Sequence, residues 1–587
     1  MKSTPKIFIC FCTLLVLIAS CKKFSVLNTD PNNIPPSAAA PDYLMANVLI
    51  KTAMDYGNLG SGNMSGAMQH TVQDAFGSTY SQYNWDPVDW TDNYARLRDN
   101  KLMLEKAQSF GWKFHQGVGL IMRAFNYGVI ADFWGDAPDS MALKGASDGA
   151  ENQFPVFDPQ EQIYDHVIAD LSASLPFLTG TTADHPEITS VTISSDVFYG
   201  GNPEKWTKLA NSLLLRYYLR LSNKRNVKSE VEALAGKVFQ SNDDDWAMPF
   251  PGLDENTSYD KASAFKGNSN FNRNKMCATL VKTLDALKDP RIVIMAEPIV
   301  TPSVVDGTKF APGDVTTLLL LQNGTRYINP AAATAAHFKE FDISTYAADR
   351  PYGTPIANVW NFFDTSPVYV GIPISYSSND FAYNINGVGT QSTSNNSYVS
   401  YMRRDIYDNP GGSLLRQRMA SYSEICFDLA EAALKGWSVG HSAEEWYNEG
   451  IRASFDCWKV FDTYQADVNN YAGCVKDYAA YIAQPSVAYN GTLDRIISQK
   501  WIASWQASCE AYMDWRRTGL PSLHIGWASF RAAIPLRFVY DNAELQNNPQ
   551  NAAAAVSKLE TTPYNGTDGN NSSWSKCWLL QGTGKPW

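Results

Sequence analysis

NPEKWTKLANSLLLRYYLRL, residues 202–221, is the stretch that decides the fold. Asn202 can cap a helix, and Pro203 suits the first helical position because its missing N–H has no partner there. The apolar side chains recur at three- and four-residue steps, which predicts a helix with one buried face. They are Trp206, Leu209, Ala210, Leu213, Leu214, Tyr217 and Leu221.

The same periodicity recurs on both sides of this stretch. It predicts helices over 116–134, over 422–436 and 442–462 with Ser421 and Ser442 as caps, and one helix through 497–515. A further helix is expected after Asp158-Pro159-Gln160-Glu161, which has the form of a capping box. The pair 422–436 and 442–462 is joined by a short turn. The chain is therefore expected to be mainly α, with a frame of helical hairpins over about 42–239 and 416–550.

Residues 240–415 differ from this frame. They are rich in Gly, Asn, Ser, Thr and Tyr, contain no long amphipathic helix, and offer two short candidate strands at 292–295 and 368–372. We interpret them as a loop-rich, irregular insert within a single domain spanning 42–587. Binding loops commonly occupy such a position, since loops held by a rigid frame carry function disproportionately.

The N-terminus has the pattern of an export signal. Lys2 and Lys6 precede an apolar run over 7–18, and the small residues Ala19 and Ser20 precede Cys21. This resembles a bacterial lipoprotein signal, in which residues 1–20 are removed, Cys21 is lipidated and 21–41 form a tether. The alternative is a secreted protein whose signal ends in a chance cysteine.

Composition narrows the function. Removing Lys2 and Lys6 with the signal changes the formal net charge from −11 to −13, which disfavours nucleic acid as a partner because phosphate binding needs concentrated Lys and Arg. Aromatic residues make up 13% of the chain. Aromatic side chains beyond those needed in the core suit carbohydrate binding, because a sugar's C–H face stacks on a ring.

Six cysteines would remain beside Cys21, widely spaced and without a CxxC motif, so buried free thiols are favoured over bridges. An oxidising compartment would still permit a Cys457–Cys474 pair.

Several motifs do not support an enzyme or a cofactor. Residues 145–149 match G-x-S-x-G but lack the preceding strand and following helix of a nucleophile elbow. The glycine-rich stretch 60–66 lacks P-loop spacing and lysine. The seven histidines show no ligand pair at helical spacing, and Asp243-Asp244-Asp245 is better explained as a solvated turn than as a calcium loop. We expect neither a metal nor a cofactor. A glycoside hydrolase remains open, since its two carboxylates need no sequence spacing.

Four stretches follow one another in a distinctive order. They are 123–127 leading into DFWGDAP at 132–138; FDPQE at 157–161; YGGNPEKW at 199–206 running on to Arg216; and 424–432 with QKW at 499–501, DWRRTGLP at 514–521 and IPLR at 534–537. Together they resemble the SusD/RagB family of surface glycan-binding lipoproteins. Physically, we interpret these signature residues as structural, with Arg216, Arg516 and Arg517 joining neighbouring helices through charge-assisted hydrogen bonds.

The resemblance implies a tetratricopeptide-like frame carrying a glycan site on loops, without catalysis. It further implies an outer-membrane lipoprotein, anchored at Cys21 and exposed at the cell surface, that delivers its ligand to a SusC-like TonB-dependent transporter. Three alternatives remain: a peptide-binding member of the same family, an endo-acting glycoside hydrolase, and a structural subunit without a ligand.

Candidate ligand-binding residues come from aromatic loops outside the helical stripes. The first group lies in GSTYSQYNWDP, before a helix that begins near Trp90, although Trp85 could equally pack as core there. The candidates are Tyr80, Tyr83, Asn84 and Trp85 in this loop and Phe271, Tyr352, Trp360 and Tyr376 in the insert.

Overall fold

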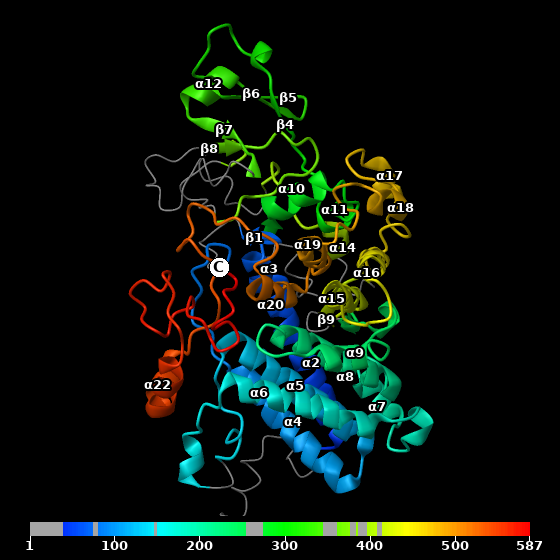
Figure 1. Ribbon diagram of the computed structural model, residues 1–587. Coiled ribbons are helices and arrows are strands. Elements are labelled where there is room, and N and C mark those ends of the chain that lie inside the picture. The colour runs from blue at the N-terminus through cyan, green and yellow to red at the C-terminus, as the bar shows by residue number, and fades with distance from the viewer. Residues whose placement is uncertain are drawn as a thin grey trace, which may run out of the picture.

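The computed structural model describes residues 39–73, 80–145, 149–253, 274–343, 361–375, 383–385, 396–407 and 414–587. About half of these residues belong to helices, and the strands are short and form small sheets (Figure 1). The mainly α fold expected from the sequence is confirmed.

The first half of the frame is a set of packed helices. It consists of α2 (Pro41–Asn58), α4 (Thr91–Phe110), α5 (Lys113–Trp134), α6 (Gln160–Ser174) and α8 (Pro203–Leu221), with the shorter α3 (Met64–Ala67), α7 (Ser190–Ser195) and α9 (Lys228–Leu234). Helix α5 is buried along most of its length and packs against α4, α6 and α8. Gly128 permits the closest approach to α8, because a Cβ there would lie 1.9 Å from the Tyr217 hydroxyl oxygen. As predicted, Asn202 caps α8 by accepting from the Lys205 backbone N–H.

The second half of the frame follows the insert. It contains α15 (Tyr422–Leu434), α16 (Ala443–Cys457), α17 (Gln465–Asn470), α18 (Tyr478–Ile482), α19 (Leu493–Ala503), α20 (Ser508–Thr518), α21 (Asn542–Asn547) and α22 (Pro549–Ser557). Ser421 and Ser442 cap α15 and α16 through their side chains, as expected. These two helices form the predicted hairpin.

Two details of the helix prediction were wrong. The helix expected through 497–515 is two helices, α19 and α20, because Gln506 has a positive φ of 67° and the Trp501 carbonyl also accepts from His70 Nε2. Asp158 does not cap α6. Its carboxylate instead accepts from the backbone N–H groups of Asp139 and Ser140, while Asp136 accepts from the Gln160 N–H at the start of α6.

The predicted insert contains more regular structure than expected. Its elements are β2 (Trp246–Pro249), β3 (Asn274–Met276), α10 (Ala278–Ala286), α11 (Ile292–Met295), β4 (Ser303–Val305), β5 (Leu319–Gln322), β6 (Thr325–Ile328), α12 (Pro330–Ala335), β7 (Phe338–Glu340), β8 (Asn361–Phe363) and α14 (Arg404–Tyr407). Strand β3 pairs with β1 (Thr71–Gln73), and β2 with β9 (Arg416–Ala420). Residues 292–295 form helix α11, so the strand predicted there is wrong. A short apolar run fits a buried helical turn as well as a strand. At 368–372 only Ile372 forms a bridge, to Cys277.

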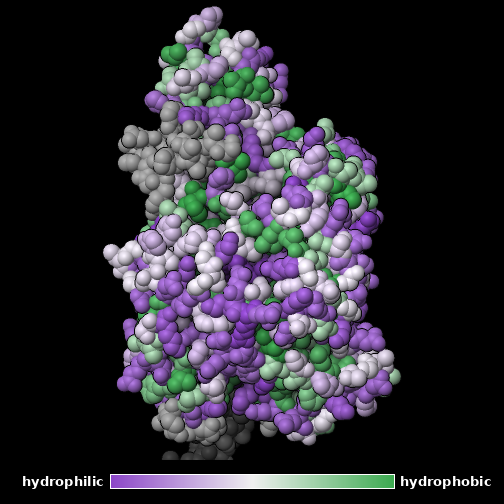
Figure 2. Space-filling model, in the orientation of Figure 1, coloured by the Kyte–Doolittle hydropathy of each residue, from purple (hydrophilic) through white to green (hydrophobic). Residues whose placement is uncertain are grey.

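Part of the insert projects from the body as a small lobe, residues 303–341 (Figure 1, top). Its sheet has the order β4-β6-β5, and Asn323-Gly324, both with positive φ, turn β5 into β6. Ile328 and Ala333 of this lobe form a small separate core with Phe363 of β8 and Ile385. The part of the insert that precedes the lobe in sequence, including β3, α10 and α11, contributes buried residues to the main core. Figure 2 shows a largely polar face with scattered apolar patches, some on this lobe.

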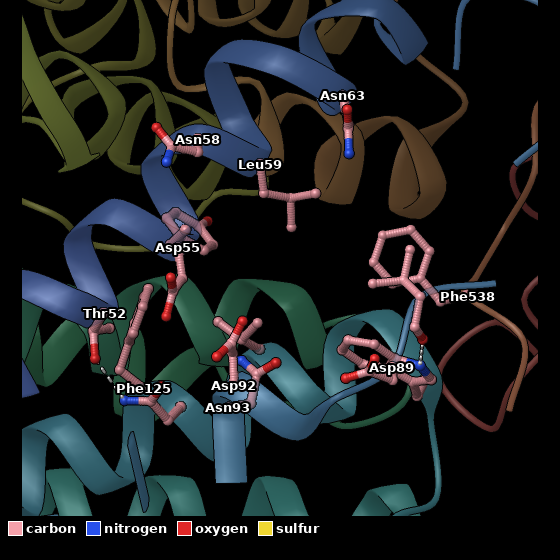
Figure 3. Close-up of a pocket in the computed structure, with 15 residues that line it drawn as sticks. Thr52, Asp55, Asn58, Leu59, Asn63, Asp89, Asp92, Asn93, Phe125 and Phe538 are labelled. Atoms are coloured by element: carbon pink, nitrogen blue, oxygen red, sulfur yellow. Dashed lines mark hydrogen bonds between the residues drawn. The ribbon is translucent and has the colours of Figure 1, made fainter. Parts of the chain in front are cut away.

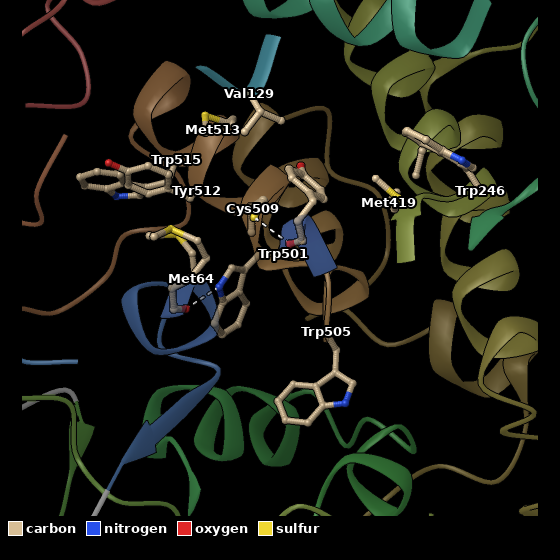
Figure 4. Close-up of a cluster of buried hydrophobic side chains, with 14 of the residues drawn as sticks. Met64, Val129, Trp246, Met419, Trp501, Trp505, Cys509, Tyr512, Met513 and Trp515 are labelled. Carbon is tan, nitrogen blue, oxygen red and sulfur yellow. Dashed lines mark hydrogen bonds between the residues drawn. The ribbon is translucent and has the colours of Figure 1, made fainter. Parts of the chain in front are cut away.

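The main core is rich in aromatic side chains where α19 and α20 meet the N-terminal helices (Figure 4). Trp501 donates from Nε1 to the Met68 carbonyl at 2.9 Å, and Tyr512 stacks with Trp515 at an interplanar angle of 16°. All six cysteines of the described part are free thiols, and Cys457 does not pair with Cys474. In the described part of the chain, no helix is both long and apolar enough to cross a membrane.

Buried ion pairs join the two halves of the frame. Arg216 of α8 donates to both oxygens of Glu424 at 2.7 and 2.8 Å, and Arg220 contacts Asp132 of α5 and Glu510 of α20. Within the second half, Arg517 of α20 donates to Glu431 of α15 and to Asp514 of its own helix, so the predicted role in joining neighbouring helices is confirmed for Arg216 and Arg517. Arg516 differs, since it donates to the Leu536 carbonyl.

Candidate functional site

The aromatic loop before α4 is mostly buried. Tyr83 is fully inaccessible, Tyr80 and Trp85 are 9% and 8% exposed, and Asn84 alone of the four candidates in this loop lies open to solvent. Tyr83 accepts from Gln69 Nε2 at 2.9 Å and donates to the Ala67 carbonyl. The ring of Trp85 stacks on Tyr80 and meets the edge of Phe538. These three rings therefore serve the core, and Tyr83 presents no face to a ligand.

The remaining predicted residues lie outside the described part of the chain. Phe271, Tyr352, Trp360 and Tyr376 fall in segments that the structure does not describe, as do Cys21 and residues 22–38 of the tether. Their roles remain predictions.

A cavity of about 430 Å³ lies next to Val88 and Asp89, which follow the Tyr80–Trp85 loop in sequence. We call it the α2–α4 cavity. It is formed by the C-terminal end of α2, the start of α4, one face of α5 and Phe538, as Figure 3 shows. Its lining residues are Thr52, Asp55, Tyr56, Asn58, Leu59, Asn63, Val88, Asp89, Asp92, Asn93, Phe125, Asn126, Val129, Trp134 and Phe538.

The upper wall of this cavity has an irregular backbone. Helix α2 continues into a π-helical turn, η1 (Leu59–Asn63), within the glycine-rich stretch 60–66. A π-turn adds one residue per turn and is common at functional sites. Leu59 and Asn63, at its two ends, both project into the cavity, with Asp92 and Asn93 below them (Figure 3).

The rim is polar and negatively charged. Arg96 Nε donates to Asp55 at 2.8 Å and its Nη2 lies 3.4 Å from Asp92, so one guanidinium bridges both carboxylates. Burial raises the pKa of Asp55, and Arg96 only partly offsets this effect. Asp89 accepts from the Thr91 backbone N–H at the start of α4. The rim thus offers carboxylate and amide groups, while Leu59, Val88 and Phe538 form an apolar wall.

This combination suits a ligand with many hydroxyl groups and an apolar face. Carboxylates and amides accept from and donate to hydroxyls, and aliphatic and aromatic side chains pack against C–H groups. Among the described residues, no cluster of three or more His, Cys, Asp or Glu side chains could hold a metal ion.

These lining residues were difficult to predict from the sequence. The polar positions of α2 and α4 look like an ordinary solvated helix face, and the cavity forms only when Phe538 packs against them. The only local indication of an irregular backbone is the glycine pair Gly60 and Gly62, which does not fit the spacing of a phosphate-binding loop.

The family follows from comparison with known proteins. Residues 31–308 and 363–541 match the SusD-like family described as starch-binding and associating with the outer membrane, so the chain belongs to this family. No curated protein matches the chain.

Solved structures share the fold along nearly their whole length. A SusD homologue of Bacteroides fragilis NCTC 9343 is 20% identical, with a TM-score of 0.64, covering 92% of this chain and 99% of its own. An outer-membrane protein of Bacteroides vulgatus ATCC 8482, described in connection with nutrient binding, is 21% identical, covers 92% and 100%, and has a TM-score of 0.64. A chitin-binding protein is 22% identical, covers 92% and 100%, and has a TM-score of 0.62.

Proposed function

We propose that this protein is a non-catalytic lipoprotein that captures an extracellular glycan in the α2–α4 cavity and passes it to a SusC-like TonB-dependent transporter. Family membership supports a nutrient-binding role at the outer membrane. The observation that carries the proposal is a cavity with an apolar wall and an amide and carboxylate rim in the family-matched part of the chain.

The expected affinity follows from the task of handing over a ligand. A few hydrogen bonds and one packed sugar face give dissociation constants in the millimolar to micromolar range, or roughly −4 to −8 kcal/mol. Weak binding permits fast release to a transporter, since affinity differences appear mainly in the dissociation rate.

A peptide ligand and glycoside hydrolysis are the competing functions. A glycosidase needs two carboxylates flanking the scissile bond, one of them free to give up a proton. In the α2–α4 cavity, Asp55 and Asp92 instead share the Arg96 guanidinium, and Asp89 accepts from the Thr91 backbone N–H, so each of the three lining carboxylates already has a partner. This arrangement favours holding a ligand over cleaving it.

The test is a titration of the full chain, purified in detergent, against neutral polysaccharides and mixed oligopeptides, with reducing ends measured over time. We expect saturable glycan binding without product. Leu59→Trp should fill the cavity and weaken binding at least tenfold, whereas Glu105→Gln, on the exposed face of α4, should not. Peptide binding alone, or reducing ends that accumulate, would contradict the proposal.

A further inference from the structure

A second, larger cavity lies where the insert meets the second half of the frame. We call it the α14–α17 cavity; it is lined by Asp285 and by residues from 293–298, 367–369, 403–405 and 467–473. Its volume is about 870 Å³, and it shares no lining residue with the α2–α4 cavity. Figure 1 shows α11, α14 and α17 close together on the upper right of the body, near this site.

Two tyrosines form its aromatic part. The rings of Tyr369 and Tyr471 meet at 86° with their centroids 5.0 Å apart. Gly473 makes room for this arrangement, because a Cβ there would lie 2.3 Å from Cζ of Tyr471. The Tyr471 hydroxyl donates to Asp285 at 3.1 Å, which fixes its ring.

Polar groups that can hydrogen-bond a ligand line this cavity. Tyr369 has an exposed fraction of only 5%, and its ring is held against that of Tyr471. A tyrosine hydroxyl can both donate to and accept from a ligand hydroxyl. Arg404 stacks over Tyr401 at 4.4 Å, and its nearest carboxylate, Glu297, lies 3.7 Å away, beyond hydrogen-bond distance. Its side chain is 42% exposed.

The charges of the lining disfavour an anionic ligand. Arg403 is already engaged, by Asp405 at 2.7 and 2.8 Å and by Asp467 at 3.4 Å. The lining carries four carboxylates, of Asp285, Glu297, Asp405 and Asp467, against two guanidinium groups, a formal charge of −2. A uronate or sulfated chain would be repelled. A neutral sugar would find donors in Arg404 and Tyr369 and acceptors in the carboxylates.

We propose that the α14–α17 cavity is a second carbohydrate-binding site, specific for neutral oligosaccharides. This proposal depends on the proposed glycan ligand, but it does not require that the α2–α4 cavity binds that ligand. Two weak sites on one chain would bind a long polysaccharide with raised avidity, because the second contact becomes intramolecular, while each site still releases short products quickly.

The test titrates the full chain in detergent by calorimetry. The probes are maltohexaose, cellohexaose, mannohexaose and chitohexaose, with hexagalacturonate as the acidic comparison. We expect one neutral hexasaccharide to bind at two sites per chain and hexagalacturonate to bind at neither. Leu59→Trp should leave one site.

Variants of the second cavity should remove the other site. Tyr369→Phe should weaken it about fivefold by removing one hydrogen bond, and Gly473→Ala should weaken it further by displacing the Tyr471 ring. Tyr43→Phe and Gly236→Ala are matched controls, since Tyr43 is 60% exposed and a Cβ at Gly236 would meet nothing within 4 Å. Thermal melts of each variant show whether the fold is kept.

The outcomes separate the two proposals. A single site that Leu59→Trp abolishes and Tyr369→Phe leaves unchanged would overturn the second site alone. Tighter binding of hexagalacturonate to the α14–α17 cavity would overturn its assigned specificity. If none of the neutral hexasaccharides binds, both proposals fail.

Discussion

At the scale of single residues, buried charges hold the helices together. Glu431 is 1% exposed and accepts from Arg517 at 2.5 and 2.6 Å. Burial opposes ionisation of this carboxyl, but the attraction of Arg517 outweighs it and lowers the pKa of Glu431. Removing one partner leaves the other charge buried and uncompensated, which is far more costly than losing a surface pair.

We therefore expect Glu431→Gln to lower the free energy of unfolding by about 3–5 kcal/mol, measured by urea denaturation. Glu105→Gln, which breaks the exposed Lys101–Glu105 pair, should change it by less than about 0.5 kcal/mol. Equal effects of the two substitutions would show that the buried pair contributes no more than a surface contact.

A second prediction at the scale of single residues concerns the stability that the Tyr83 hydroxyl contributes. Its hydroxyl joins the loop before α4 to Gln69, which also accepts from Thr279 of α10 at 2.6 Å. Tyr83→Phe should lower the free energy of unfolding by about 1–2 kcal/mol and leave glycan affinity unchanged. A loss of glycan affinity with an unchanged free energy of unfolding would show that Tyr83 contacts the ligand after all.

At the scale of elements, His70 links β1 and α3 to the break between α19 and α20. Its Nε2 donates to the Trp501 carbonyl at 3.0 Å and its Nδ1 accepts from the Ser508 hydroxyl at 2.8 Å, so the neutral ring satisfies both partners. Burial lowers the pKa of His70 to about 3. In the unfolded chain the pKa of a histidine is near 6.5, so below that pH the unfolded state binds a proton that the folded state does not.

Stability contributed by neutral His70 is therefore complete above about pH 6.5 and lost as the pH falls toward 3. The loss should be about 1.4 kcal/mol per pH unit. Urea unfolding at pH 7, 6, 5 and 4 should show a shallower pH dependence for His70→Gln than for the native chain, and no change for the exposed His441→Gln. Identical slopes for the native chain and His70→Gln would refute this role.

The same elements show how far the sequence predicts the fold. Helix caps at Asn202, Ser421 and Ser442 were predictable because the cap and the apolar stripe lie within a few residues of each other. The break at 504–507 was not, since it depends on His70, more than 400 positions away in sequence. The α2–α4 cavity could not be predicted from the sequence either, because Phe538, which forms part of its wall, is far from α2 and α4 in sequence. Tyr80, Tyr83 and Trp85 look like free loop aromatics in the sequence, but all three are buried in the folded chain, where Trp85 packs against Tyr512 of α20 and Phe538.

At the scale of the whole molecule, the proposed lipid anchor can be tested independently of ligand binding. Two or three acyl chains hold a protein at a membrane far more firmly than one. We expect Cys21→Ala to abolish labelling by radioactive palmitate and to move the protein from the membrane fraction to the soluble fraction. Unchanged membrane association without label would show that another contact retains it.

The central claim is that the α2–α4 cavity holds the glycan, and hydrogen–deuterium exchange with and without a saturating neutral oligosaccharide tests it most directly. The account predicts slower exchange at 58–63 and 88–93, the two segments that face each other across the cavity. Saturable binding that leaves the exchange of both segments unchanged would contradict it.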